Sequence, residues 1–252
     1  WLLTTPFWVR VSSGHATPLA QPPNDGPKPY PAAAVATDLL AFVKLVGLQS
    51  LAVHWYQWNR EVFDTKYPHY TPQDGFAAAV AKMSAAGIKV VPYTNGMMMD
   101  PTTTEFTAEA KLGTCALYGG TAEPRRWVET RVEEDALHKG WNFSIMDPSS
   151  AFWPAKLDSV ADHLVRTLGV AGVYFDGVSD KCSPLCVEPG RSHAADERTD
   201  TEAGNAGIRA MFSTAAQAGV RAGGARLLCL HGRRTDRDVD ARVLRQFGPH
   251  RE

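Results

Sequence analysis

The sequence has few cysteines, almost no net charge and no long apolar run. Four cysteines in 252 residues are too few for the disulfide framework of a small secreted domain. The 26 basic and 27 acidic residues leave a formal net charge of -1, so neither nucleic acid nor an anionic membrane is indicated as a partner. No apolar stretch approaches the roughly 20 residues that a membrane-spanning helix requires. With 44% hydrophobic residues, the chain has the composition of an ordinary globular protein with a sizeable core.

Sequence motifs of several enzyme classes are missing as well. The chain contains no glycine-rich phosphate loop, no G-x-S-x-G nucleophile elbow and no H-E-x-x-H zinc motif. Cys182, Cys186 and His193 offer thiolate and imidazole ligands for zinc, but the sequence supplies no evident fourth ligand. A local disulfide or two free thiols is the favoured interpretation, and a metal-dependent hydrolase is the weaker alternative. We therefore predict no cofactor and no metal.

The chain starts with Trp1 and not with Met. Its opening stretch, WLLTTPFWVR, lacks the basic start, the apolar stretch and the cleavage site of a signal peptide. We expect a segment upstream of Trp1 to be missing, and a targeting signal would lie in that segment. The sequence therefore assigns no cellular compartment, although secretion is one option. It assigns no oligomeric state either.

Strand-like apolar runs alternate with amphipathic helical runs along the chain, a pattern typical of a parallel α/β sheet or barrel. The predicted strands are 6–13, 50–58, 88–96, 170–177 and 225–232. The predicted helices are 35–47, 71–87, 126–138, 147–169 and 200–219. For the second helix, Thr71 is the expected N-cap, Asp74 fills the capping-box position and Gly87 is the expected C-cap. The stretch 94–150 shows no clear strand, so we interpret it as a long insertion after the third strand.

This order of elements predicts an α/β fold with a parallel sheet or barrel; as a barrel of the (β/α)8 TIM type it would be incomplete, with about four to five βα units. We assign the partial barrel to residues 1–220. Residues 221–252 form an atypical segment with eight arginines and no lysine. Two interpretations of this segment stay open: a solvated surface helix with a tail, or replacement of the native fold by truncation, mis-splicing or a frame error. Because an open half barrel exposes an unpaired edge, we expect the isolated chain to be marginally stable or prone to aggregation.

The residues that end the predicted strands are the candidates for chemistry, because the carboxyl ends of the strands form the active-site face of such a barrel. These residues are His54, Trp55, Tyr56 and Trp58 at the second strand, Tyr93, Thr94 and Asn95 at the third, and Asp176 at the fourth. Aromatic rings cover the C–H faces of a sugar, and amides and carboxylates bind its hydroxyls. A carboxylate is also one half of the pair that hydrolyses glycosides. The alternatives are core packing for the rings and a polar strand end for Asp176.

Three segments together carry a family resemblance. They are HWYQWNREVFDTKYPHYTPQDGF from His54, GIKVVPYTNG from Gly87, and MDPSSAFWPAKLDSVADHLVRTLGVAGVYFDGVS from Met146. The chain resembles, over about residues 50–215, a poorly characterised family of glycoside-hydrolase-like (β/α)8 barrels classed as a domain of unknown function. That family is similar in outline to α-galactosidase and endo-α-N-acetylgalactosaminidase barrels.

The resemblance implies a retaining glycosidase that acts on O-glycosidic bonds of a carbohydrate, with Asp176 as the catalytic nucleophile. It also implies the substrate-binding residues: His54, Tyr93, Asn95 and His193 for polar contacts, and Trp55 or Trp58 for ring stacking. Such barrels usually end their fifth strand in a glutamate. Here that stretch reads RLLCLHGRRT, with His231 and no glutamate nearby, so no proton donor is assigned. The alternative function is a non-catalytic carbohydrate-binding or inactive pseudo-enzyme barrel.

Overall fold

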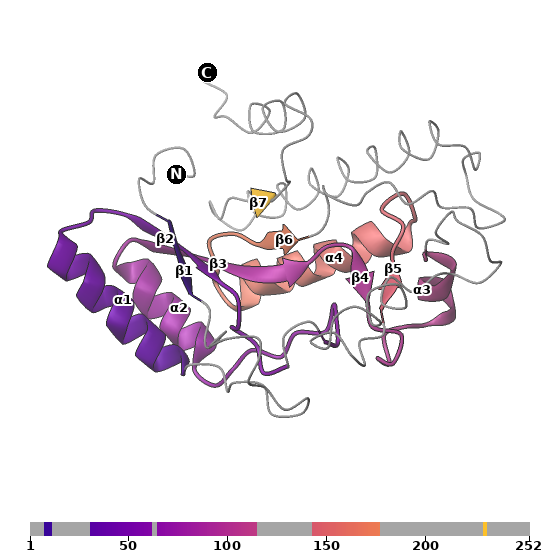
Figure 1. Ribbon diagram of the computed structural model, residues 1–252, viewed down its shortest axis with the longest axis horizontal. Helices are drawn as coiled ribbons and strands as arrows, with labels where there is room; N and C mark the ends of the chain where they lie inside the picture. Colours follow the sequence, from indigo (N-terminus) through magenta and orange to yellow (C-terminus); the bar gives the residue numbers. More distant parts are fainter. Residues whose placement is uncertain (1–7, 12–30, 62–64, 115–142, 177–228, 231–252) are drawn as a thin grey trace, which may run out of the picture.

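The computed structural model describes residues 8–11, 31–61, 65–114, 143–176 and 229–230 (Figure 1). In chain order its elements are β1 (Trp8–Val11), α1 (Ala32–Val46), β2 (Leu51–Trp55), α2 (Phe76–Ala85), β3 (Ile88–Asn95), β4 (Met98–Met99), α3 (Ala108–Leu112), β5 (Ser144–Ile145), α4 (Phe152–Asp162), β6 (Tyr174–Asp176) and β7 (Cys229–Leu230). A π-helical turn, His163–Thr167, continues α4. None of the helices in these ranges is long and apolar enough to cross a membrane.

Five strands form one sheet in the order β1-β2-β3-β6-β7, and every neighbouring pair is parallel. The α/β class with a parallel sheet is therefore confirmed, and each predicted strand contributes to the sheet. Its register sets Trp55 opposite Pro92 and Asn95 opposite Asp176. Within the described ranges the sheet is open, with β1 and β7 at its edges, and no closed barrel is formed.

Helices α1, α2 and α4 pack with one face of the sheet in a single apolar core. Alternate residues of β2 point to that face, among them Val53 and Trp55, and they meet Leu39 of α1, Val80 of α2 and Leu157 of α4 in the same cluster. A doubly wound sheet would carry helices on both faces and would reverse its strand order. The described units instead follow chain order across the sheet, which excludes a doubly wound arrangement for this part of the chain.

The predicted start of the second helix is wrong. Helix α2 begins at Phe76, after Gly75 in the left-handed conformation at φ 75°, and no side chain caps it. Thr71 lies outside the helix, where its carbonyl accepts a hydrogen bond from the Arg60 N–H at 2.8 Å. Asp74 forms an ion pair with Arg60. The loop is thus bound to the residues after β2, and this tertiary contact overrides the capping pattern of the sequence.

The expectation that residues 94–150 hold no strand is also wrong. β4 and β5 form a small antiparallel pair, with Met98 opposite Ile145 and Met99 opposite Ser144. Strands of two residues are too short for periodicity, and their partners lie far apart in the sequence, so no local pattern indicates them. The predicted helices 126–138 and 200–219 lie outside the described residues, and the boundary at 220 stays a prediction.

Asp158 on α4 is half-buried, and its ionised form lowers the stability of the folded state. Its Oδ1 is buried and has no hydrogen-bond partner in the described part of the chain. Burial raises the pKa of this carboxyl from 3.8 to about 6. Above that pH the ionised form destabilises the folded state, whereas near pH 3 the group is protonated in both states and the cost disappears.

We expect Asp158→Asn to increase the free energy of unfolding at pH 7 by about 1 kcal/mol, a figure reduced to allow for the partial exposure of the side chain. Near pH 3 the variant and the parent should agree. Urea denaturation at both pH values measures this difference. Asp162→Asn is the control, because the Asp162 carboxylate has an ion-pair partner, Arg166, at 2.7 Å. Loss of stability in Asp158→Asn at pH 7 would contradict the prediction.

Candidate active site

The sheet face turned away from the helices carries a second, aromatic cluster. Side chains two residues apart share a face of a strand, so Tyr93 follows Val91 on β3 and Asp176 follows Tyr174 on β6. The cluster comprises Tyr67, Val91, Tyr93, Met97, Met98, Phe143, Ile145 and Tyr174, with Tyr56 and Tyr70 packed against it. Asp176 thus ends its strand on the face that carries this cluster.

The carboxylate of Asp176 is held by two tyrosines. The Tyr93 hydroxyl donates to Oδ2 at 3.0 Å, and the Tyr174 hydroxyl donates to Oδ1 at 3.3 Å. The backbone carbonyl of Asp176 accepts the Gly96 N–H at 2.8 Å. The Asp176 side chain is half-buried, so a ligand at the carboxyl ends of the strands can reach this fixed carboxylate.

His54 lies beside this carboxylate site, among aromatic rings. Its ring centre is 4.2 Å from that of Tyr174 and 4.6 Å from that of Tyr56. Tyr56 in turn stacks on Tyr93, with ring centres 4.6 Å apart and planes at 22°. The guanidinium of Arg10 on β1 lies 3.9 Å from the Tyr56 ring centre, in a cation–π contact. The structure therefore brings His54, Tyr93 and Asp176 of the predicted set together.

Trp55 and Trp58 lie elsewhere, in the core. Both are 1% exposed, and each ring centre is 5.1 Å from that of Phe76 on α2. The indole N–H of Trp58 donates to the Tyr93 carbonyl at 2.7 Å. Rings enclosed in this way offer no free face to a sugar, so we leave both tryptophans out of the proposed substrate contacts.

Asn95 shapes the turn after β3. It is 2% exposed, and its side-chain oxygen accepts the N–H groups of Met97 at 2.9 Å and Met98 at 2.8 Å. Its own N–H donates to the Tyr70 hydroxyl at 2.7 Å. This is the local hydrogen bonding typical of asparagine in turns, and a role in substrate binding stays a prediction.

His193, Cys182 and Cys186 lie outside the described residues. Within the described ranges, no group of three or more His, Cys, Asp or Glu side chains could hold a metal ion.

Tyr174 is a functional candidate that the sequence analysis missed, although a signal for it existed. It precedes Asp176 by two residues in an expected strand, and this spacing alone puts both side chains on one face. What the spacing does not indicate is that its hydroxyl reaches the carboxylate.

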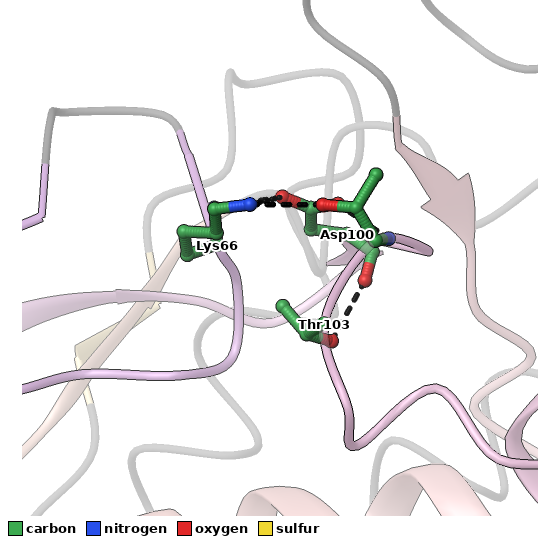
Figure 2. Close-up of polar contacts among 4 residues, drawn as sticks. Lys66, Asp100 and Thr103 are labelled. Atoms are coloured by element: carbon green, nitrogen blue, oxygen red, sulfur yellow. Dashed lines mark hydrogen bonds and ion pairs between the residues drawn. The ribbon is translucent and has the colours of Figure 1, made fainter.

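A second missed residue, Asp100, fixes the loop that follows β2. Its Oδ1 accepts the Thr102 N–H at 2.7 Å and the Thr102 hydroxyl at 2.6 Å, while its Oδ2 accepts the Lys66 N–H at 3.2 Å. Figure 2 shows the Lys66 ammonium directed at this carboxylate, 3.6 Å from Oδ2, and the Thr103 hydroxyl bound to the Asp100 carbonyl. The Asp100 N–H donates to the Tyr67 carbonyl at 2.8 Å. Asp100 thereby holds Tyr67 in the aromatic cluster.

Glu105 ties the same loop to α4. Burial works against its charge, but Lys156, with Nζ at 2.8 Å, and His69, with Nδ1 at 3.6 Å, outweigh that effect and lower the pKa of Glu105. The loop beside the candidate site is therefore anchored at two points by carboxylates.

We expect Asp100→Ala to destabilise the protein by about 1–3 kcal/mol, because it removes the charged acceptor of the Lys66 N–H, the Thr102 N–H and the Thr102 hydroxyl. Hydrogen exchange should increase at the amides of residues 65–73. The matched control is Asp74→Ala, which removes an ion pair whose aspartate is 94% exposed and should cost less than about 0.5 kcal/mol. Urea denaturation and exchange measured by mass spectrometry test both variants. Equal small losses in the two would show that Asp100 is not an anchor.

The parallel sheet and the layer of helices on one of its faces define an α/β protein. The α-N-acetylgalactosaminidase NagBb from Bifidobacterium bifidum superposes with a TM-score of 0.58 at 14% identity, over 88% of this chain and 33% of that chain. The GH36 α-galactosidase AgaA from Geobacillus stearothermophilus gives 0.53 at 11% identity, over 80% of this chain and 26% of that chain. At such identities the likeness shows the fold alone.

The family model described as "Domain of unknown function (DUF6259)" matches residues 1–196, and the chain belongs to that family. A protein named "Putative glycoside hydrolase" from Bacteroides thetaiotaomicron is 27% identical over 77% of this chain. One named "Putative glycoside hydrolase 22789" from Monosiga brevicollis is 31% identical over 50% of it. The matched regions span 25% and 12% of these relatives. The resemblance seen in the three sequence segments is thus confirmed.

Proposed function

We propose that this chain is part of a retaining glycoside hydrolase in which Asp176 is the nucleophile. The observation that carries the proposal is the carboxylate at the end of β6, bound by two tyrosine hydroxyls on the face opposite the helices. Two further findings support it. The chain-ordered, singly wound sheet is the arrangement of strands in a (β/α)8 barrel, and the two sequence relatives are named as glycoside hydrolases.

In this reaction an oxygen of Asp176 forms a bond to the anomeric carbon of the sugar while the bond from that carbon to the leaving oxygen breaks. Water then attacks the same carbon, the bond to Asp176 breaks, and the carboxylate is restored as the proton of the water passes to solvent. The leaving oxygen of a natural glycoside also requires a proton. A 4-nitrophenolate leaving group does not, which makes aryl glycosides suitable for testing the nucleophile by itself.

The substrate class that we propose is a carbohydrate glycoside. His54 and Tyr56 are half-buried, so their rings retain surface beside the carboxylate for the C–H face of a sugar. The glycosidases of similar fold are named for α-galactose and α-N-acetylgalactosamine, which selects the first probes. Their 4-nitrophenyl α-glycosides are the compounds to use.

We expect Asp176→Asn to lower kcat/KM for whichever probe the parent chain hydrolyses by about 1000-fold or more, because the amide cannot form the glycosyl ester. Release of 4-nitrophenolate measures the rate, and Asp162→Asn on α4 is the matched control. Unchanged hydrolysis by Asp176→Asn would remove the nucleophile role. If the parent binds the glycosides by calorimetry without turnover, the chain is a non-catalytic carbohydrate binder instead.

A further inference from the structure

We infer that Tyr93 and Tyr174 are positioning residues that hold the carboxylate of Asp176 in one orientation for attack. The inference rests on the proposed function and adds to it a role for two phenolic hydroxyls. The family resemblance implies that Tyr93 binds substrate hydroxyls. In the structure its hydroxyl is bound to the Asp176 carboxylate.

The two hydroxyls reach the carboxylate from different directions. Tyr93 and Tyr174 are paired in register on adjacent parallel strands, with ring centres 5.9 Å apart and planes at 29°. Asp176 stands two register positions further toward the carboxyl ends, opposite Asn95. Tyr93 therefore binds Oδ2 from the neighbouring strand, and Tyr174 binds Oδ1 from the same strand. With one donor on each oxygen, rotation of the carboxylate plane would break both hydrogen bonds.

Both donors are themselves fixed. Tyr93 is 4% exposed and Tyr174 is 6% exposed, so water competes little for their hydroxyls. The Tyr93 ring stacks on Tyr56, and its carbonyl accepts the Trp58 indole N–H at 2.7 Å. Buried Trp58 therefore has a structural role in the site. It fixes the backbone of Tyr93, whose hydroxyl in turn binds the Asp176 carboxylate.

A nucleophile must be aligned with the anomeric carbon that it attacks, and a carboxylate fixed in this way meets that requirement. An unrestrained carboxylate rotates about its terminal torsion, and only part of its population would point at the reacting atom. The hydroxyls act on Asp176 and not on the sugar. Their loss should therefore lower kcat and leave KM nearly unchanged, since ground-state binding does not depend on them.

The test uses the full chain and the same two 4-nitrophenyl α-glycosides, with the variants Tyr93→Phe and Tyr174→Phe. Each keeps the ring and removes only the hydroxyl. We expect kcat to fall by about 10- to 100-fold in Tyr93→Phe, with KM within about threefold of the parent. The loss should be smaller in Tyr174→Phe, whose hydrogen bond is longer at 3.3 Å. The matched control is Tyr67→Phe, a buried tyrosine of the same cluster with its ring centre 6.5 Å from that of Tyr93. Its kcat should stay within about threefold of the parent.

Two results would overturn the inference. The first is a kcat in both Phe variants equal to that of Tyr67→Phe while Asp176→Asn is inactive, which would leave the proposed nucleophile intact. The second result comes from crystal structures of the parent and of the Tyr93→Phe/Tyr174→Phe double variant. If Asp176 has the same single rotamer in both structures, the inference is wrong. This second measurement needs no activity, so it decides the positioning role even if the chain hydrolyses neither probe and the proposed function fails. A carboxylate ordered in the parent and spread over rotamers in the double variant supports the inference.

Discussion

The parallel pairing of β3 with β6 is the interaction on which the candidate site depends. It sets Tyr93 beside Tyr174, and from there both hydroxyls reach the carboxylate of Asp176. Side chains alternate between the two faces of a strand, so a slip of one residue would turn the site residues of β6 toward the helices. The Thr94 hydroxyl, bound to the Tyr174 carbonyl at 2.8 Å, and the Gly96 N–H, bound to the Asp176 carbonyl at 2.8 Å, hold the register at both positions.

One face of the sheet packs against the helices, and the opposite face carries the candidate site. Contacts from the helix-facing core stabilise the backbone of that site. Two buried tryptophans link the two faces: Trp58 donates its indole N–H to the Tyr93 carbonyl, and Trp153 of α4 donates to the Gly96 carbonyl at 2.8 Å. Both acceptors lie where β3 ends beside Asp176. The core therefore fixes the backbone at the strand ends, and the strand ends fix the carboxylate.

The family and the fold narrow the range of possible reactions but do not identify one. The family is described as a domain of unknown function, and the glycosidases of similar fold are 11% and 14% identical to this chain. One fold carries many activities, so the case for a glycosidase must come from the site. What the site adds is a half-buried carboxylate held by tyrosine hydroxyls and bordered by His54 and Tyr56, an arrangement suited to a nucleophile beside a sugar ring.

The sequence by itself determined the order of the five sheet strands and of helices α1, α2 and α4, and the place of Asp176 at a strand end, because these follow from local periodicity and from the residues that interrupt it. Tertiary structure decided the rest. Trp55 and Trp58 share a strand end with His54 in the sequence, but packing against Phe76 takes both rings into the core. The β4–β5 pair, and the two tyrosine hydroxyls on the Asp176 carboxylate, depend on which segments become neighbours in space. Contacts between residues distant in the chain are set by the packing of the whole sheet, and a local pattern does not contain them.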